Sequence, residues 1–370
     1  MLLDSGKYEL AATVFRQVVG RQGEKVNTMT RRRFLAAATV IRLRAAEPAF
    51  ERIDTHTHIH RNSPALLAAM ERAGWKALSI CDSREIGDEP SKLAEMIRGT
   101  VDATRESKGR LAWVATFDAR GFESRDFAGR AIDGLRQCFD QGAAGVKIWK
   151  NIGMAIRSKS GDYLLPDNKV FTPVFEAVQR EGKTLLTHLA DLNTAWKPLD
   201  PANPDSAYYK SHPEWLMDGR PGAPSKDVIL AARDRILSRH PKVRVIGCHL
   251  GSNEEDLSQA AKRLDAFPNF AVDVAARVRI LARQDRENVR EFMMKYSDRV
   301  LYATDFQLGT GNDEAAAKSF LASHENEWNF FSSGEVLTYR NAQVRGLALP
   351  DMVLRRIFHD NAVRWLPGIA

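Results

Sequence analysis

The chain has 370 residues, of which 44% are hydrophobic and 27% are charged, and this is enough for one enzyme-sized domain with a substantial core. The net charge of +7 is uneven, because residues 1–50 hold nine Lys or Arg and only four Asp or Glu. The basic excess therefore belongs to the N-terminal segment and argues against a nucleic-acid-binding face. Cys81, Cys138 and Cys248 are too few and too far apart for a disulfide framework, so we expect reduced, buried thiols.

Residues 1–50 form a predicted N-terminal extension. Within residues 29–46, three arginines followed by the apolar run Phe34–Ile41 resemble a twin-arginine export motif. Two further arginines interrupt this run and no small-x-small cleavage site follows, so a periplasmic and a cytoplasmic location both stay open. A translation start at Met29 is a related hypothesis. No apolar stretch approaches the roughly 18 residues that span a bilayer, so we expect no stable membrane insertion.

The first predicted strand, Arg52–His58, ends in two histidines with one residue between them. Residues two apart on a strand project from the same face, so His56 and His58 can both contact one divalent metal ion. Ser63 followed by Pro64 predicts that a helix begins directly afterwards. A polar pair on an exposed edge strand is the alternative for this motif alone.

From residue 51 onward, short apolar runs alternate with amphipathic segments, which is typical of a parallel sheet with helical crossovers. Eight strands are expected, namely Arg52–His58, Lys76–Cys81, Leu111–Phe117, Gly145–Lys150, Thr184–His188, Val243–His249, Phe270–Val274 and Val300–Asp305. Eight such units predict an α/β fold of the (β/α)8 TIM-barrel type over residues 51–370. A doubly wound open sheet is the competing fold, but no glycine-rich phosphate loop follows the first strand.

Polar residues end three later strands of this pattern. His188 ends the fifth predicted strand, His249 the sixth and Asp305 the eighth. In a barrel the C-terminal ends of the strands meet at one mouth, so we expect a metal site there. Lys147 in the fourth strand should point into the barrel, where a buried ammonium needs either an anionic partner, such as Asp305, or a chemical change.

These residues carry a resemblance to a known family. The set comprises Asp54-Thr55-His56-Thr57-His58, His188, His249-Leu250-Gly251 and Thr304-Asp305. It resembles the amidohydrolase superfamily, in particular its amidohydrolase-related branch, which also contains aminocarboxymuconate-semialdehyde decarboxylase-like enzymes. The resemblance covers residues 51–367.

The resemblance implies one divalent cation bound by His56, His58, His188 and Asp305. Three imidazoles and a carboxylate suit Zn²⁺ best, with Mn²⁺ or Fe²⁺ as alternatives. It also implies that Asp305 and His249 are the catalytic residues, Asp305 as the proton acceptor and donor and His249 as an acid/base or electrostatic group.

Lys147 determines the expected number of metals. Binuclear members of the superfamily carbamylate a lysine on this strand, so that it bridges two metal ions, whereas the related branch is usually mononuclear. We therefore expect one metal, with Lys147 paired to a carboxylate or to the substrate. A second metal that involves Lys147 or His249 is the alternative.

Long segments follow three of the predicted strands, at residues 151–168, 190–226 and 307–340, and should cover the mouth. Their aromatic residues indicate a small-molecule substrate with apolar or ring surface. Arg120 and Arg277, in loops after the third and seventh strands, are candidate substrate-binding cations.

Three functions from different classes are compatible with this pattern. The first is a metal-dependent hydrolase, in which metal-activated water attacks an amide, lactone or ester of a small organic substrate. The second is a non-oxidative decarboxylase of an aromatic or unsaturated carboxylic acid, which needs Arg120, Arg277 or Lys147 to receive the carboxylate. The third is a catalytically silent metal- or ligand-binding barrel. A homodimer is expected only by analogy with the fold.

Overall fold

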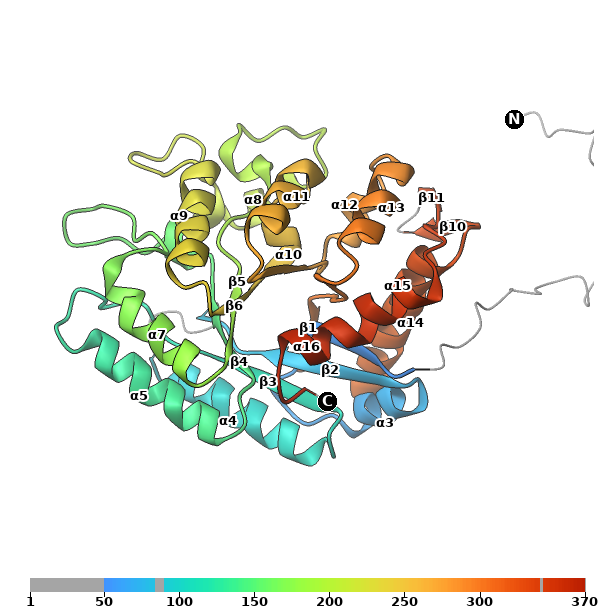
Figure 1. Cartoon of the computed structure of the whole chain (residues 1–370), viewed down its shortest axis with the longest axis horizontal. Coiled ribbons are helices and arrows are strands. Elements are labelled where there is room, and N and C mark those ends of the chain that lie inside the picture. The colour runs from blue at the N-terminus through green and yellow to red at the C-terminus, as the bar shows by residue number, and fades with distance from the viewer. Residues whose placement is uncertain (1–49, 84–89, 340–341, 370) are drawn as a thin grey trace, which may run out of the picture. The chain divides into compact units, whose positions relative to one another are not determined.

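A parallel sheet that closes on itself organises the chain (Figure 1). The computed structural model describes residues 50–83, 90–339 and 342–369. The strands of this sheet are β1 (Arg52–His58), β2 (Trp75–Ile80), β3 (Leu111–Thr116), β4 (Gly145–Ile148), β5 (Thr184–Thr187), β6 (Arg244–Gly247), β7 (Phe270–Asp273), β8 (Val300–Leu301) and β9 (Phe306–Gln307).

The strand order shows that the sheet is a barrel. Neighbours follow the order β8-β7-β6-β5-β4-β3-β2-β1-β9, and each neighbouring pair is parallel. β8 pairs with β7 and β9 pairs with β1, and β9 follows β8 in the chain after a short turn, so this segment closes the sheet. This confirms the predicted α/β barrel.

Helices follow most of the strands and cover the outside of the sheet. They are α3 (Pro64–Arg72), α4 (Pro90–Glu106), α5 (Phe127–Asp140), α6 (Asn151–Met154), α7 (Thr172–Arg180), α8 (Ser206–Ser211), α9 (Lys226–Arg239), α10 (Cys248–Gly251), α11 (Leu257–Ala266), α12 (Val278–Leu281), α13 (Arg286–Lys295), α14 (Asp313–Ser332), α15 (Asp351–Arg355) and α16 (Asn361–Trp365). Shorter helical turns are η2 (Lys169–Phe171), η3 (Asn193–Trp196), η4 (Pro213–Trp215) and η5 (Arg356–Asp360), and β10 (Val336–Tyr339) pairs with β11 (Ala342–Arg345) in a separate hairpin. Figure 1 shows α4, α5 and α7 along one side of the sheet and α9 and α11 along the other.

The local sequence explains where α3 begins. The Ser63 side chain accepts a hydrogen bond from the Leu66 amide at 3.4 Å, and Pro64 occupies the first turn, where its missing N–H costs nothing. The predicted helix start after the two histidines is thus confirmed.

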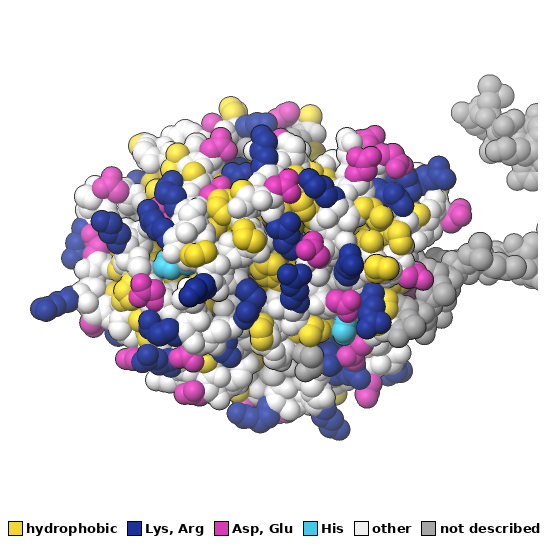
Figure 2. Space-filling view, viewed as in Figure 1, with side chains coloured by type: hydrophobic (Ala, Val, Ile, Leu, Met, Phe, Trp, Pro, Cys, Tyr) yellow, Lys and Arg dark blue, Asp and Glu magenta, His cyan; other side chains and the backbone are white. Residues whose placement is uncertain are grey.

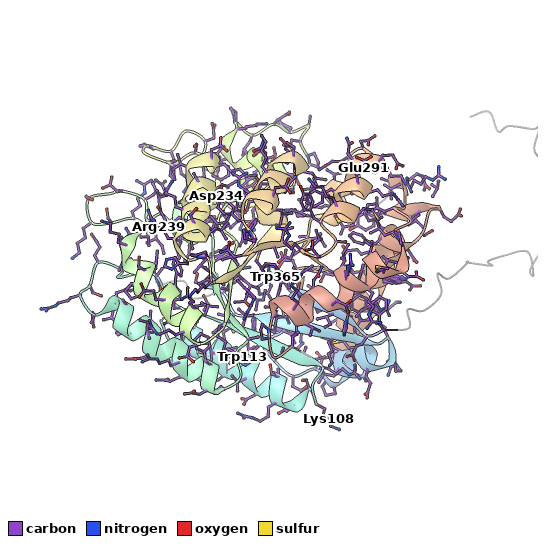
Figure 3. All side chains as sticks on the ribbon, viewed as in Figure 1. Lys108, Trp113, Asp234, Arg239, Glu291 and Trp365 are labelled. Carbon is purple, nitrogen blue, oxygen red and sulfur yellow. The ribbon has the colours of Figure 1, made fainter. Side chains whose placement is uncertain are left out.

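Alternate residues of the strands fill the interior of the barrel with apolar side chains. Ile53, Ile80 and Leu186 belong to this buried layer, and Trp365 of α16 packs against it. Figure 3 labels Trp365 beside the sheet. Full burial of each large aliphatic side chain stabilises the fold by about 1.5–3 kcal/mol. The polar ends of the strands, which carry the histidines, lie at the other end of the barrel, at its mouth.

All of the predicted strands except the first end earlier than expected, and two of them give way to turns that contain a residue with a positive φ. The predicted eighth strand is divided into β8 and β9, and Asp305 lies between them with φ at 65°. The predicted sixth strand stops at Gly247, and His249 follows in the tight turn α10 with φ at 58°. A Cβ at Gly247 would lie 2.6 Å from the Phe270 ring, so glycine allows this turn to approach β7. In these two turns the backbone is not extended, and it places the His249 and Asp305 side chains at the mouth.

The predicted N-terminal extension, with its twin-arginine-like segment at residues 29–46, lies outside the described residues. Its boundary at residue 50 and the location of the protein therefore stay predictions. Among the described residues, no helix has the length and apolar character needed to cross a membrane. Figure 2 shows Lys and Arg side chains mixed with Asp and Glu over the face in view.

Candidate metal centre

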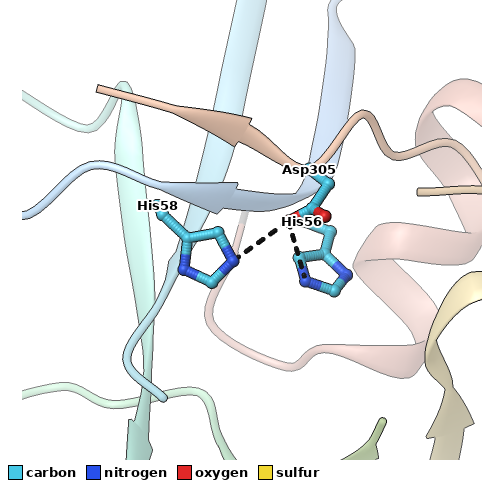
Figure 4. Close-up of side chains that lie close together, drawn as sticks. All are labelled: His56, His58 and Asp305. Carbon is cyan, nitrogen blue, oxygen red and sulfur yellow. Dashed lines mark ion pairs between the residues drawn. The ribbon is translucent and has the colours of Figure 1, made fainter. Parts of the chain in front are cut away.

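Three predicted ligands meet at the barrel mouth. Asp305 Oδ1 lies 3.1 Å from His58 Nε2 and 3.8 Å from His56 Nε2 (Figure 4). One ligand atom from each of the three side chains lies within 4.8 Å of the others. Asp305 Oδ1 is buried and accepts no hydrogen bond from any described residue. A divalent ion bound between these atoms would satisfy that oxygen, so the residues fit a metal.

Hydrogen bonds orient both imidazole rings toward Asp305. His56 Nδ1 lies 2.9 Å from Asp273 Oδ2, and His58 Nδ1 lies 2.9 Å from the Ile80 carbonyl oxygen. Because both partners are acceptors, each Nδ1 donates and each Nε2 is left with its lone pair. Such contacts behind a metal ligand fix its tautomer and raise its basicity.

Asp273 is a residue of the candidate site that the sequence analysis did not name. It ends β7 and is fully buried, and its Oδ1 accepts hydrogen bonds from the backbone amides of His249, at 2.7 Å, and Ala275. Burial raises the pKa of its carboxyl, but His56, His249 and Lys147 together lower the pKa further, so the pKa lies below the usual range. The available signal was an acidic residue at the end of an apolar strand. The predicted strand ended at Val274, so Asp273 was placed inside the strand and not at its C-terminal end.

His188 and His249 lie side by side at the same mouth. Their ring centroids are 4.2 Å apart, and the His249 ring is 4.9 Å from that of His56. His249 Nδ1 donates to the Ala275 carbonyl oxygen at 2.8 Å. His188 Nε2 lies 3.4 Å from Asp191 Oδ1 and makes no hydrogen bond to a described residue. His188 is outside the three-residue cluster, so its role as a fourth ligand stays a prediction.

Burial and the neighbouring charges keep His188 and His249 neutral, and the surrounding histidines keep Asp305 ionised. Burial lowers the pKa of His188 well below its ordinary value, and Lys150 and Lys147 lower it further. Burial also lowers the pKa of His249 well below the ordinary value, with further contributions from His188 and Arg277. Burial raises the pKa of Asp305, but the adjacent His58, His56 and His249 bring that pKa well below the usual range. Neutral imidazoles and a carboxylate are the protonation states that bind a metal.

Lys147 has different partners from those expected. It is almost completely buried, and its Nζ lies 2.9 Å from Cys248 Sγ and 3.4 Å from His56 Nε2, rather than beside a carboxylate. Burial, and then the positive charge of Lys147, lower the pKa of His56. Burial raises the pKa of Cys248, so this residue is a thiol. The partners of Lys147 come from other parts of the barrel, since Cys248 directly follows β6 and His56 lies on β1, and alternation within one strand does not reveal them.

The two candidate substrate-binding arginines lie in different places. Arg120 pairs with Asp118, with Nη2 and Oδ2 2.7 Å apart, and lines a separate cavity of about 380 Å³. Arg277 is 7% exposed and lines the mouth cavity together with His249 and Asp305. The structure thus brings Arg277 and Lys147, but not Arg120, to the candidate site.

The mouth cavity has a volume of about 590 Å³ and aromatic walls. Trp149, which follows β4, packs edge to face on Trp215 of η4, with ring centroids 4.8 Å apart. Lys150 Nζ lies 4.4 Å from the Trp215 ring centroid and pairs with Asp191. The long segment at residues 190–226 therefore covers the mouth, as expected, and leaves room for a small molecule with a ring.

Comparisons with known proteins agree with this architecture. A family model described as Amidohydrolase matches residues 53–368. No curated protein sequence matches the chain. Among solved structures, 4-oxalomesaconate hydratase from Rhodopseudomonas palustris is 12% identical, with 86% of this chain and 96% of that chain covered and a TM-score of 0.51. The 2,6-dihydroxybenzoate decarboxylase from Rhizobium is 15% identical, with 86% and 98% covered and a TM-score of 0.50. At these identities the similarity concerns the fold.

Proposed function

Because the chain belongs to the amidohydrolase family, whose model spans residues 53–368, we propose that it is a metal-dependent decarboxylase of a small aromatic or unsaturated carboxylic acid. The observation that carries this proposal is Arg277, a buried cation in the wall of the cavity that holds the candidate metal ligands. The sequence analysis placed a hydrolase first and a decarboxylase second. The cavity favours the decarboxylase, since Arg277 and Lys147 can both receive a carboxylate.

Arg277 is suited to hold an anionic group of the substrate. Its Nε makes no hydrogen bond to a described residue and lies 3.7 Å from Glu254 Oε2. Burial lowers the pKa of Arg277, but Glu254, Asp191 and Asp305 together raise it above the ordinary value, so the side chain is charged. A buried donor without a hydrogen bond costs about 1–3 kcal/mol, and a carboxylate bound to this guanidinium would offset part of that cost.

His56, His58 and Asp305, with His188 as the fourth ligand, would hold one divalent ion, for which Zn²⁺ is the first choice and Mn²⁺ or Fe²⁺ are alternatives. When bound, this ion supplies a Lewis acid for the substrate's oxygen atoms. Two observations support this assignment. Histidine nitrogens and a carboxylate are ligands that zinc prefers, and Asp305 Oδ1 makes no hydrogen bond to a described residue.

The surrounding residues would carry out the remaining steps. Trp149 and Trp215 pack against the ring of the substrate, and Arg277 holds its carboxylate. Asp305 takes the proton that a substrate hydroxyl loses on binding and returns it to the carbon that bears the carboxylate. The electron pair of the carbon–carbon bond then goes back to the ring, and carbon dioxide leaves. His249 also lines the cavity, and because its Nδ1 donates to the Ala275 carbonyl oxygen, its Nε2 would be a hydrogen-bond acceptor for the substrate.

A hydrolase is the second candidate, because one observation also favours it. Asp305 Oδ1 is an ionised acceptor that makes no hydrogen bond to a described residue, so it could equally take a proton from an attacking water. An amide, lactone or ester that carries a carboxylate for Arg277 would then be the substrate.

One assay separates the two reactions. The metal-reconstituted protein is incubated in deuterium oxide with hydroxybenzoic and unsaturated carboxylic acids, and in parallel with lactones, esters and amides of similar size. We expect carbon dioxide release and one deuterium on the product carbon that lost the carboxylate. Hydrolysis without carbon dioxide would instead establish the hydrolase. No turnover by a protein that holds its metal would point to the silent binding barrel.

A further inference from the structure

We infer that His324, on α14, is a positioning residue for the metal centre and acts through the carboxylate of Asp54. This inference rests on the metal centre proposed above. His324 does not line the mouth cavity, and the sequence analysis gave it no role. Its effect would be to hold two metal ligands, His56 and Asp305, in register.

His324 and Asp54 contact each other inside the protein, and both side chains are fully buried. His324 Nε2 lies 2.9 Å from Asp54 Oδ2, and neither side chain is exposed. His324 Nδ1 lies 2.7 Å from the carbonyl oxygen of Phe320. Both ring nitrogens therefore contact oxygen atoms, and these two contacts hold the ring between α14 and Asp54.

The Asp54 carboxylate connects this pair to two separate stretches of the barrel. Its Oδ1 accepts from the backbone amide of His56 at 3.0 Å and from that of Thr304 at 3.1 Å. Its Oδ2 also accepts from the Thr304 hydroxyl. One carboxylate thus ties the backbone of the first ligand to the residue that precedes Asp305.

The backbone at Asp305 needs such support. Its φ of 65° lies in the left-handed region, which is costly for a residue with a side chain. Thr304 is held on the N-terminal side of this turn by Asp54, and the Asp305 amide itself donates to the His56 carbonyl oxygen. If the Asp54 carboxylate moved, the distance between the carboxylate of Asp305 and the imidazole of His56 would change with it.

Aromatic rings fix the position of His324. Its ring stacks on Phe320 with centroids 3.7 Å apart and meets Trp75 edge to face at 4.6 Å. The imidazole therefore has one orientation, and through it α14 determines where the Asp54 carboxylate lies.

The test measures zinc affinity of the metal-free protein by competition with a chromophoric chelator. His324→Phe keeps the ring packing but removes the contacts with Asp54 and the Phe320 carbonyl oxygen, and we expect about 10–100-fold weaker zinc binding. His324→Gln can still donate to Asp54 and should lie between His324→Phe and the wild type. Cobalt(II) bound to the phenylalanine variant should show altered visible absorption bands, because these bands report the geometry of the ligands.

Glu327→Gln is the matched control, since it changes another buried polar group of α14. Glu327 accepts hydrogen bonds from Tyr302 and Tyr339 rather than contacting Asp54. We expect its zinc affinity to stay within twofold of the wild type. Zinc binding by His324→Phe within twofold of the wild type, or an equal loss in Glu327→Gln, would overturn the inference.

Two further outcomes keep the test decisive. If His324→Phe does not fold, wild-type affinity in His324→Gln would overturn the inference. If the wild-type protein binds neither Zn²⁺ nor Mn²⁺, the metal centre itself is wrong and the inference is lost with it. A wild-type protein that binds zinc while the His324 variants do so equally well rejects only the positioning role.

Discussion

The backbone amide of Asp305 donates a hydrogen bond to the carbonyl oxygen of His56 over 2.8 Å. This bond joins the last part of the barrel to the first strand, where β9 pairs with β1. The same contact that closes the sheet therefore places two candidate metal ligands side by side. Barrel closure and metal binding should stabilise each other, because the residues that would hold the ion come from both sides of the point at which the sheet closes.

Removal of both β1 histidines should abolish metal binding. In the double variant His56→Ala, His58→Ala, only Asp305 remains of the three clustered ligands. We expect elemental analysis to find about one zinc per wild-type chain and almost none in the variant. His359→Ala, a histidine outside the mouth cavity, should keep its metal. Two metals per wild-type chain would contradict the mononuclear centre and return Lys147 to consideration as a ligand.

Asp305→Asn should reduce kcat by about 10³-fold, because the amide cannot accept and return a proton. Asparagine tolerates the positive φ found at this position, so the fold should be preserved and part of the metal retained. Steady-state kinetics and elemental analysis of the same preparation test this. Asp313→Asn, at the exposed start of α14, should keep kcat within twofold. Wild-type activity in Asp305→Asn would reject the proposed proton transfer.

Arg277→Gln should raise KM for a carboxylate substrate by about 10–100-fold, because it removes a charge-assisted contact. It should also lower the free energy of unfolding by about 3 kcal/mol, since the buried Glu254 loses an ionic partner. The double variant Arg277→Gln, Glu254→Gln should regain stability in urea but not the low KM. If the double variant recovered both properties, Arg277 would have only a structural role.

The metal-free protein should lose stability as the pH falls below 6.5. Burial lowers the pKa values of His188 and His249 in the folded state, with Lys150 adding to the effect on His188. The unfolded chain takes up protons near pH 6.5 while these folded histidines stay neutral. Their contribution is thus present above that pH and is lost as the pH falls toward the folded pKa values, by up to about 1.4 kcal/mol per pH unit for each histidine.

Urea unfolding midpoints of the metal-free protein at pH 7.5 and 5.5 would measure this loss. His188→Asn should show a smaller difference between the two pH values than the wild type, because one titrating group is gone. His359→Asn should leave the difference unchanged. An equal pH dependence in His188→Asn and the wild type would contradict the assignment.

The strand pattern and three clustered ligands were predictable because their signals are local. Apolar runs separated by amphipathic segments report burial on both faces of a parallel strand, and the His56–His58 spacing places two imidazoles on one face. The division of the eighth strand was not predictable, since the positive φ of Asp305 depends on hydrogen bonds to β1.

The sequence by itself determined the barrel, its mouth and the residue types suited to a metal, because periodicity and strand-end chemistry are written within short segments. Only the tertiary structure decided that Asp273 orients His56, that Lys147 lies against Cys248, and that Arg277 rather than Arg120 reaches the cavity. Each of these contacts joins side chains from different strands or loops. Which side chains meet depends on how neighbouring segments pack in space, and the order of residues within one segment does not specify the distances between segments.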